Sequence, residues 1–135
     1  MKSAEPIPQC GAICEVGDDI VLVSNKSGSR WVIPKGHFES TDTDEAMRAG
    51  QEAWEEAGVR GLVSESALGR FTYTKHSRLF SVAVYRIEQC QLSDTWPESH
   101  LRKRILVSPA AALELVREAG LRELIRSRIG RFPLA

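Results

Sequence analysis

The sequence has no excess charge of either sign, since its 18 lysines and arginines balance 18 aspartates and glutamates. A neutral chain has no overall electrostatic attraction to nucleic acid or membrane surfaces, so an anion site must be a local basic patch. The chain also lacks an apolar run near the ~18 residues that a membrane-spanning helix needs. Its N-terminus shows no signal-peptide pattern. These absences predict a cytoplasmic protein without membrane or nucleic-acid partners.

Cysteines are few and are not spaced for structural use. Cys10, Cys14 and Cys90 are odd in number and lack the C-x-x-C spacing of zinc sites. Cys10 and Cys14 would share one face of a strand, which predicts buried free thiols in a reducing compartment. With 42% hydrophobic residues over 135 positions, the chain can bury a core without cross-links. We expect one domain over residues 1–135, with residues 1–8 as a loose N-terminal arm, and nothing specifies an oligomeric state.

What the sequence does contain is an acidic helix within residues 36–59. Asp42 is suited to be its N-cap, and Glu45 three residues later completes a capping-box pattern. Gly58 lies where a left-handed residue would end the helix. The sequence therefore predicts a helix that begins near Asp42 and ends at Gly58.

This helix has a small-residue face and an acidic sector. At about 100° per residue, one face carries mostly small side chains, which predicts close packing against a flat partner: Ala46, Gly50, Ala53, Trp54 and Ala57. The other side carries Glu45, Arg48, Glu52, Glu55 and Glu56. Carboxylates at these spacings repel one another. The spacing alone is compatible with a solvated acidic face, and equally with a site where a hard divalent cation binds the carboxylate oxygens.

The rest of the chain reads as strands followed by helices. A polar, irregular stretch is expected at residues 89–102, and Gly120 is expected to break the C-terminal helix into two. Strands are expected at residues 10–16, 20–24, 30–36, 59–66, 68–75, 79–87 and 105–107, and helices at 109–119 and 121–129. Ser108 and Pro109 are typical of an N-cap followed by the first helical position. Many strands with few helices predict an α/β protein whose mixed sheet lies between helices.

Basic residues gather in three places outside the acidic helix, each at a loop or strand end. The groups are Lys26, Arg30 and Lys35; Lys75, His76 and Arg78; and Arg102, Lys103 and Arg104. For any single residue, a solvated side chain is the simpler interpretation, and an isolated histidine such as His76 is more typical of surface hydrogen bonding. If the groups converge near the glutamates, they would bind a polyphosphate while a cation bridges it to the carboxylates.

The acidic helix and its preceding loop resemble the signature of the Nudix hydrolases, G-x5-E-x7-R-E-U-x-E-E-x-G-U, where U is aliphatic. The matching residues are Gly36, Glu52, Glu55, Glu56, Gly58 and Val59. Gln51 stands where the signature has arginine, and we hypothesise that Arg48, one turn earlier, partly supplies the missing charge. One extra residue follows Gly36, so the first glutamate of the signature falls on Asp42 or Thr43. The resemblance implies a Nudix-type α/β/α sandwich with a mixed central sheet.

The resemblance also implies the site. Its metal shell maps to the carbonyl of Gly36 and to Glu52, Glu55 and Glu56, with Glu39 as a possible outer ligand. Mg²⁺ suits such oxygen ligands, and Mn²⁺ can replace it. Glu56, at the metal-bound water, and Glu55 are the implied catalytic residues.

A narrower resemblance is to the diphosphoinositol polyphosphate phosphohydrolases, a Nudix branch that also cleaves diadenosine polyphosphates. It rests on the segment 30–36, on Lys75 with His76, and on the segments 96–98 and 102–104. It implies water attack on a phosphoanhydride bond of a small polyphosphorylated substrate. The implied substrate-binding residues are Lys26, Arg30, Lys35, Lys75, His76, Arg102 and Arg104. Trp96, beside a proline, could cover a ligand.

Two other functions stay open. A Nudix enzyme for nucleoside diphosphate derivatives or RNA 5′ ends would be indicated by an aromatic clamp for a base, whereas inositol phosphates need a ring of lysines and arginines without a stacking surface. A Nudix-fold binding domain without catalysis would be marked by loss of the signature glutamates, and all three of them are present here.

Overall fold

The structure, a computed structural model, describes residues 5–39 and 41–129. In this part of the chain, eight strands form a sheet with the path β3-β2-β1-β7-β5, while β4 pairs with β1, β6 with β7 and β8 with β2. The elements are β1 (Ile7–Val16), β2 (Asp19–Ser24), β3 (Trp31–Val32), β4 (Lys35–His37), α1 (Glu45–Ala57), β5 (Val59–Val63), β6 (Gly69–Lys75), β7 (Arg78–Leu92), β8 (Arg104–Val107), α2 (Pro109–Leu115) and α3 (Ala119–Ile129).

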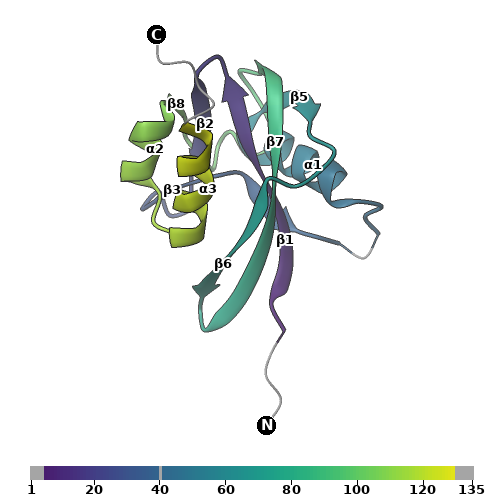
Figure 1. The fold of residues 1–135 in the computed structure, drawn as a ribbon. Coiled ribbons are helices and arrows are strands. Elements are labelled where there is room, and N and C mark those ends of the chain that lie inside the picture. The colour runs from purple at the N-terminus through teal and green to yellow at the C-terminus, as the bar shows by residue number, and fades with distance from the viewer. Residues whose placement is uncertain (1–4, 40, 130–135) are drawn as a thin grey trace.

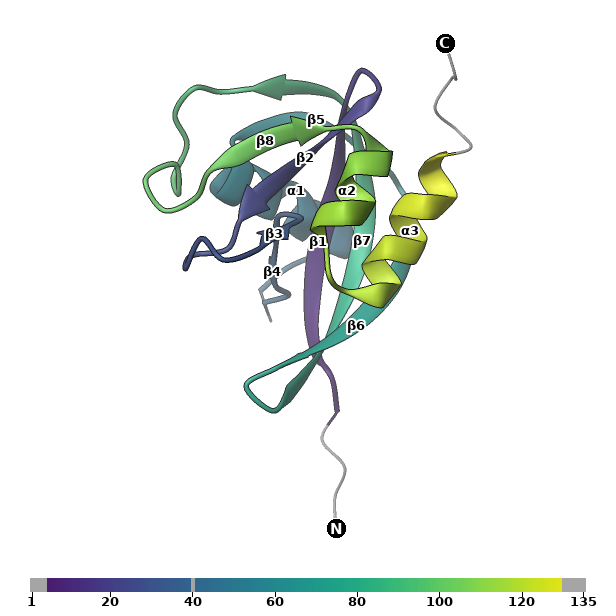
Figure 2. The same cartoon turned by 90° about the vertical axis from the view of Figure 1, so that its left-hand side faces the viewer.

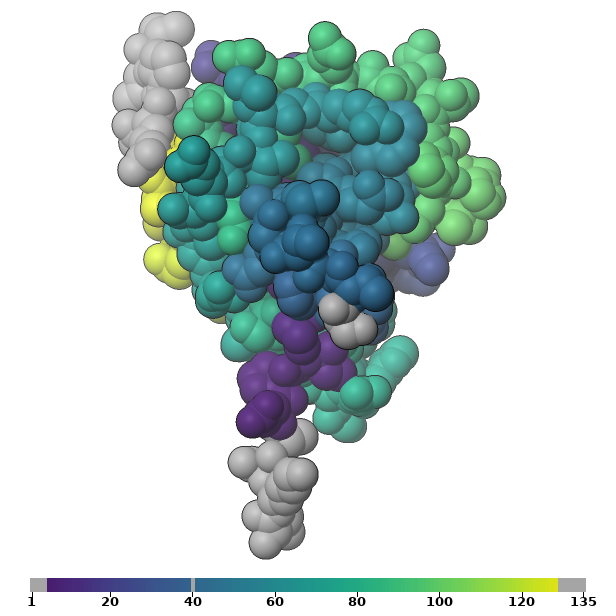
Figure 3. Space-filling view, turned by 90° about the vertical axis from the view of Figure 1, so that its right-hand side faces the viewer, coloured from purple at the N-terminus to yellow at the C-terminus, as the bar shows by residue number. Residues whose placement is uncertain are grey.

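The sheet is mixed and lies between two helical layers, as the sequence predicts. β1 and β7 run parallel, whereas β1 is antiparallel to β2 and to β4. α1 covers one face of the sheet, and α2 with α3 covers the other (Figures 1 and 2). On the α1 side, the helix and its preceding loop form the middle of the molecular surface, flanked by the green segment that follows β7 (Figure 3). Among the described residues, no helix has the length and apolarity to cross a membrane.

On the α1 face of the sheet, β1 contributes small side chains, and the neighbouring strands add valines and Ile87. Cys10, Ala12 and Cys14 of β1 are fully buried, and all three cysteines of the chain are free. On α1 itself the buried residues are Ala49, Glu52, Ala53, Glu56 and Ala57. The predicted small-residue face is therefore rotated, since Ala46, Gly50 and Trp54 are only partly buried. This rotation carries two glutamates of the acidic sector into the interior.

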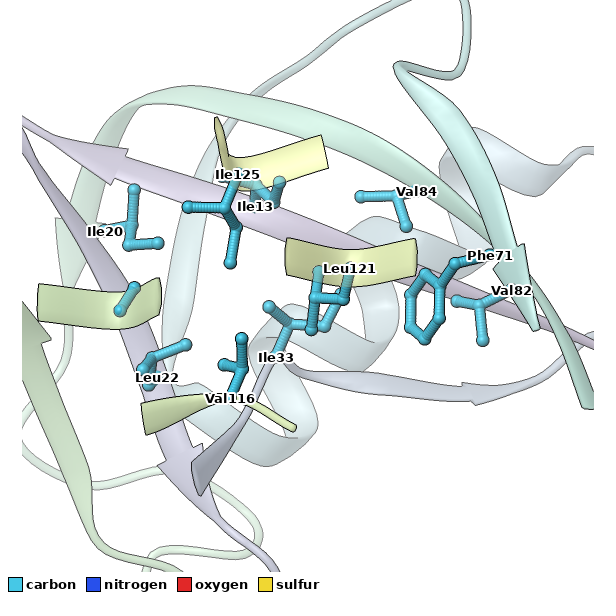
Figure 4. Close-up of a cluster of buried hydrophobic side chains, with 11 residues drawn as sticks. Ile13, Ile20, Leu22, Ile33, Phe71, Val82, Val84, Val116, Leu121 and Ile125 are labelled. Carbon is cyan, nitrogen blue, oxygen red and sulfur yellow. The ribbon is translucent and has the colours of Figure 1, made fainter. Parts of the chain in front are cut away.

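The opposite face holds most of the largest buried side chains. The main cluster joins the sheet to α2 and α3 through branched aliphatic residues and one aromatic ring: Ile13, Ile20, Leu22, Ile33, Phe71, Val82, Val84, Val116, Leu121 and Ile125 (Figure 4). Each such side chain stabilises the fold by about 1.5–3 kcal/mol when fully buried. The cluster with the most buried apolar side chains therefore lies on the face away from α1.

Several predicted boundaries are wrong. β1 begins at Ile7, within the stretch predicted as a loose arm, and residues 1–4 of that stretch lie outside the described residues. β7 continues to Leu92, through a left-handed Gln89 at φ 54°, into the stretch predicted as irregular.

The C-terminal helices are also divided differently. α2 ends at Leu115, and α3 begins at Ala119, so Gly120 lies inside a helix instead of breaking one. A methyl group at position 120 would lie 2.5 Å from Cβ of Phe71. The glycine therefore serves close packing of α3 on β6, which a sequence pattern does not distinguish from a helix break.

Candidate functional site

The N-terminus of α1 is capped by Asp44, which corrects the prediction of Asp42. The Asp44 backbone is extended at φ −157°, and its side chain accepts a hydrogen bond from the backbone N of Met47 at 2.7 Å. Glu45 makes no capping box, because its carboxylate accepts hydrogen bonds from Arg70 and from the hydroxyl of Tyr85. The helix begins two residues later than predicted, since the longer loop moves the cap. At the other end, Gly58 is left-handed at φ 66°, as predicted.

The loop before α1 brings Gly36 against Glu52. Gly36 lies in β4 and pairs with Cys10 of β1. A methyl group at position 36 would lie 2.1 Å from Oε1 of Glu52, so only glycine permits this approach of backbone and carboxylate. The carbonyl and carboxylate oxygens supplied here are those that a hard divalent cation prefers.

Glu52 is paired with Arg48. Nη1 of Arg48 donates to Oε2 of Glu52 at 3.0 Å, while its Nε and Nη2 donate to Asp42 at 3.0 and 2.8 Å. Burial raises the pKa of Glu52, and the hydrogen bond from Arg48 opposes that shift. Gln51, by contrast, is exposed. Arg48 therefore places a positive charge on Glu52 where Gln51 does not, in agreement with the compensation hypothesis.

Glu56 is held between the chain before it and a distant arginine. Its Oε1 accepts a hydrogen bond from the backbone N of Lys35 at 3.2 Å, and its Oε2 accepts one from Nη2 of Arg102 at 3.2 Å. The side chain is 9% exposed, and burial raises its pKa to about 7, although Arg102 acts in the opposite direction. A carboxyl group with such a pKa can accept and release a proton near neutral pH.

Glu55 completes the acidic group. It is half-buried, and its charge adds to the raised pKa of the neighbouring Glu52. It lines a hollow of about 330 Å³ together with Asp42, Arg48 and Gln51. Within residues 5–39 and 41–129, no three acidic, histidine or cysteine side chains form a ready-made metal cage, and Glu52 and Glu56 each face an arginine. The donors nevertheless fit a hard cation, because they are all oxygens and Gly36 lets the Glu52 carboxylate lie directly against the backbone.

Arg102 joins the acidic group to a basic pocket. Besides Glu56, it donates to Glu98 at 2.8 Å and to the carbonyl of Ser24 at 3.1 Å. A pocket of about 470 Å³ lies beside it, lined by Ser24, Lys26, Ser27, Gly28, Trp31, Ser99, His100, Leu101, Arg102 and Lys103. Two of the predicted substrate-binding residues, Lys26 and Arg102, therefore share one pocket.

Lys35 and Arg30 lie on the side of the site that faces α3. Nζ of Lys35 lies 5.1 Å from the centre of the Tyr73 ring. Burial lowers the pKa of Lys35, while the charges of Glu56 and Glu118 oppose this shift. Arg30 lies 3.9 Å from Glu118. The sequence did not indicate Glu118, because one glutamate in an amphipathic helix region has no distinguishing pattern.

Other predicted residues lie elsewhere. Lys75 and His76 are exposed at the tip of the β6–β7 hairpin, which projects away from α1 (Figure 1), and His76 has a positive φ of 51°. Glu39 is an exposed loop residue whose backbone N donates to Asp42.

Arg104 and Trp96 stabilise the C-terminal end of α1. Nη1 of Arg104 donates to the carbonyls of Ala57 and Ser93, both at 2.8 Å, and its guanidinium lies 4.3 Å from the Trp96 ring centre. Trp96 in turn donates to the carbonyl of Glu56 at 2.9 Å. These contacts engage Trp96 with the helix end instead of a ligand, and give Arg104 a structural task that its place in a basic run did not reveal.

A row of aromatic rings near Gly36 was also missed from the sequence. The rings of Tyr73 and Phe80 stack at 5.0 Å, and the ring of His37 stacks on Phe80 at 6.1 Å. Tyr73 and Phe80 are register partners in the β6–β7 hairpin, and His37 directly follows Gly36. The alternation around Phe71 and Tyr73, combined with the register of the β6–β7 hairpin, would have placed the rings of Tyr73 and Phe80 side by side.

Comparison with known proteins gives relatives over most of the chain, although no family model matches it. It is 34% identical over 116 residues to Nudix hydrolase 21, chloroplastic, of Arabidopsis thaliana, covering 84% of this chain and 58% of that protein. It is also 34% identical over 114 residues to Nudix hydrolase 4 of the same plant, covering 82% and 53%. The chain thus spans a little over half the length of the curated relatives it matches.

Solved structures share the fold at low sequence identity. The E. coli ORF135 protein superposes with a TM-score of 0.74 at 16% identity, covering 97% of this chain and 96% of that one. The C. elegans Ap4A hydrolase superposes with a TM-score of 0.71 at 20% identity, covering 96% and 100%. At such identities, the likeness concerns the fold alone.

Proposed function

The chain belongs to the Nudix hydrolase superfamily, and from this premise we propose that it hydrolyses a phosphoanhydride bond in a small polyphosphorylated substrate with the help of a divalent cation. The observation that carries the proposal is the position of Glu56, a buried carboxylate with a pKa of about 7 between Arg102 and the backbone of Lys35. A group that can accept a proton thus lies beside cations that can hold phosphate.

The residues proposed to hold the cation are Glu52, Glu55, Glu56 and the carbonyl of Gly36. Mg²⁺ suits this oxygen set, and Mn²⁺ is a substitute. When bound, such a cation neutralises phosphate charge and lowers the pKa of a coordinated water. The close contact between position 36 and Glu52, where a methyl group would lie only 2.1 Å from the carboxylate, supports this assignment.

The side chains of the protein have distinct tasks in this proposal. Glu56 accepts the proton of the attacking water, and Glu55 assists it from the adjacent solvent-facing position. Arg48 keeps Glu52 ionised despite burial, because its guanidinium donates directly to that carboxylate. Arg102 and Lys26 hold phosphate groups in the basic pocket that adjoins Glu56.

Diphosphoinositol polyphosphates and diadenosine polyphosphates are the first candidate substrates. The basic pocket supports them, since Lys26, Arg102 and Lys103 line one hollow. A solved structure with the same fold is named as an Ap4A hydrolase, which is compatible with the diadenosine compound. Arg30 and Lys35 would serve the same substrate from the α3 side, whereas Lys75 and His76 would reach it only as long, exposed side chains at the hairpin tip.

A nucleoside diphosphate derivative or an RNA 5′ end is the second candidate, and the aromatic row favours it. Tyr73, Phe80 and His37 form stacked rings directly beside the loop of Gly36. Such a row offers a base the apolar contact that an inositol ring does not need. A binding domain without catalysis is less favoured, because all three signature glutamates are retained.

The cytosol is the proposed compartment, in keeping with three free cysteines. The names of curated relatives include chloroplastic and mitochondrial proteins, so the thiols are also compatible with those organelles in this proposal.

The test is a phosphate-release assay with MgCl₂ on diadenosine polyphosphates, diphosphoinositol pentakisphosphate, nucleotide sugars and triphosphorylated RNA. We expect turnover of at least one of them, abolished by chelation and by Glu56→Gln. Glu114→Gln is the matched control, since Glu114 is exposed on α2. Activity that survives in Glu56→Gln would contradict the role of Glu56, and no turnover of any substrate would contradict the proposed function.

A further inference from the structure

Glu118 is a buried carboxylate without a hydrogen-bond partner. It lies in the connection between α2 and α3, where its backbone carbonyl accepts a hydrogen bond from the N of Arg122 at 2.9 Å. Its side chain is 7% exposed, and Oε1 has no hydrogen-bond partner among the described residues. Oε2 lies 3.9 Å from Nη2 of Arg30, which is beyond hydrogen-bonding distance. Most buried polar atoms are satisfied, so this exception requires an explanation.

The surroundings of Glu118 are those of the proposed substrate site. Arg30, from the loop before β3, faces it, and the charge of Glu118 reaches Lys35 of β4 and Tyr73 of β6, on which Glu56 also acts. The charge of Glu118 raises the pKa of both Lys35 and Tyr73. Burial, the larger cause in each case, lowers the pKa of Lys35 and raises that of Tyr73. Nζ of Lys35 and the Tyr73 ring are themselves 5.1 Å apart. The buried carboxylate therefore lies beside Arg30 and close enough to Lys35 and Tyr73 for its charge to act on both.

A carboxylate in this position has opposite effects on two parts of a substrate. It repels a phosphate group, and it cancels part of the attraction exerted by Arg30 and Lys35. It attracts an N–H or O–H donor, and such a charge-assisted hydrogen bond is stronger than one between neutral groups. A site meant only for phosphates would be expected to carry a lysine or a neutral residue here.

We propose that Glu118 is a specificity-determining residue that accepts a hydrogen bond from the nucleoside part of the substrate and disfavours densely phosphorylated rings. The aromatic row of Tyr73, Phe80 and His37 supplies the neighbouring apolar surface. This inference rests on the proposed function, and it selects nucleoside polyphosphates over diphosphoinositol polyphosphates among the candidate substrates. The donor is either an amino group of the base or a hydroxyl group of the ribose.

The test measures binding to the metal-free protein by calorimetry, with adenosine 5′-monophosphate and inositol hexakisphosphate as probes. Glu118→Gln removes the charge with little change in shape. We expect it to weaken the nucleotide about fivefold and to strengthen the inositol phosphate about fivefold, in line with a charge-assisted bond and a like-charge repulsion. The control, Glu114→Gln, makes the same change in net charge at an exposed position and should alter either affinity less than about twofold.

Two analogues identify the donor. Purine riboside 5′-monophosphate lacks the amino group of the base, and 2′,3′-dideoxyadenosine 5′-monophosphate lacks both ribose hydroxyls. The analogue whose binding no longer responds to Glu118→Gln has lost the group that Glu118 binds. A full response with both analogues would overturn the proposal, as would equal strengthening of nucleotide and inositol phosphate, or a wild-type protein that does not bind the nucleotide.

Failure of this inference is separable from failure of the proposed function. Because binding is measured without metal, a protein whose nucleotide affinity depends on Glu118 but which hydrolyses nothing would contradict only the hydrolase proposal. A protein that hydrolyses the substrates with unchanged affinities in Glu118→Gln would contradict only the role of Glu118. Unfolding curves of both variants in the absence of ligand check that each of them is folded.

Discussion

The two faces of the sheet differ in the size of the side chains that pack against their helices. Toward α1, β1 presents Cys10, Ala12 and Cys14, and alanines of the helix pack against them. Toward α2 and α3, the same strand presents Ile13 to a cluster of leucine, isoleucine, valine and phenylalanine. Small side chains let a helix backbone approach a sheet closely, whereas large ones hold the layers apart and bury more apolar area.

The difference shows how the fold separates chemistry from stability. Close approach of α1 brings Glu52 to Gly36 and brings Glu56 to the backbone of Lys35. The two buried carboxylates are costly unless they are paired, and Arg48 and Arg102 supply the partners. The opposite face contains the large apolar side chains that offset such costs. Substitution of a signature glutamate on one face and of a large apolar side chain on the other should therefore affect different measurable quantities.

The largest effect is expected for Glu56→Gln on the α1 face. The amide has nearly the same shape but cannot take a proton or act as an anionic ligand, so kcat should fall by about 10²–10⁴-fold. Circular dichroism and unfolding curves should show a folded protein. Turnover close to that of the wild type would mean that Glu56 is not the catalytic group. The α1 face would then not carry the chemistry assigned to it.

Leu121→Ala makes the complementary change on the opposite face. Leu121 is 1% exposed within the large cluster. Its truncation should lower the free energy of unfolding by about 2–5 kcal/mol, which urea titration measures. Because α3 and the helix that carries the signature glutamates lie on opposite faces of the sheet (Figures 1 and 2), kcat per folded molecule should stay within about twofold. A loss of kcat comparable to that of Glu56→Gln would show that the two faces are not separable.

The sequence predicted the sheet and the helices around it well, because the alternation typical of strands and the signals at helix ends are local patterns. The apolar alternation of the strands, the left-handed Gly58 and the Ser108–Pro109 helix start all depend on neighbouring residues, and the structure confirms them. The orientation of α1 was not predictable in the same way. The spacing placed Glu52 and Glu56 opposite the small-residue face and left a solvated face and a metal site equally open. The partner that makes burial of Glu56 tolerable, Arg102, is 46 residues away.

The basic residues show the same limit of sequence reasoning. Arg102 and Arg104 belong to one run, yet one pairs with Glu56 and the other binds the carbonyl of Ala57 at the end of α1. Glu118 has no local signal at all, since its importance comes from loops that fold against it. Which member of a cluster faces a site is decided by tertiary contacts that no spacing rule encodes.

A third prediction concerns the pH dependence of stability without metal. Glu56 has a pKa of about 7 in the folded protein, against an ordinary value of 4.5. Between these values the folded state holds a proton that the unfolded state releases, so this group lowers stability as pH rises from about 4.5 to about 7. Glu56→Gln should therefore be more stable than the wild type by up to about 3 kcal/mol at pH 8.

The measurement compares thermal unfolding of both proteins in chelator across pH 4.5–8. The advantage of Glu56→Gln should shrink to a few tenths of a kcal/mol near pH 4.5, where the carboxyl of the folded wild type is protonated and that of the unfolded chain is about half protonated. An advantage that grows toward acid would have the wrong sign and would show that Arg102 more than offsets the burial of Glu56.

A smaller effect is expected for Arg48→Ala. Arg48 donates to Glu52 and Asp42, so its loss removes the charge that keeps Glu52 ionised and oriented. We expect Mn²⁺ affinity, followed by electron paramagnetic resonance, to fall about tenfold, equivalent to about 1.4 kcal/mol. Gln51→Ala is the matched control on the exposed neighbour and should change the affinity less than about twofold. The reverse order would contradict the compensation by Arg48.

The smallest effect is expected for Gly50→Ala, and it tests whether close approach is confined to the inner side of α1. Gly50 lies in the middle of the helix, where alanine is favoured over glycine by about 0.5–1 kcal/mol. The added methyl group would meet only Cγ2 of Val63, at 3.4 Å, whereas the same addition at Gly36 would lie 2.1 Å from Glu52. Gly50→Ala should thus raise stability slightly in urea titrations and leave metal affinity unchanged. Destabilisation would show that α1 is pressed against β5 as tightly as against β4, so that both sides of the helix, and not one, are fitted to the sheet at close range.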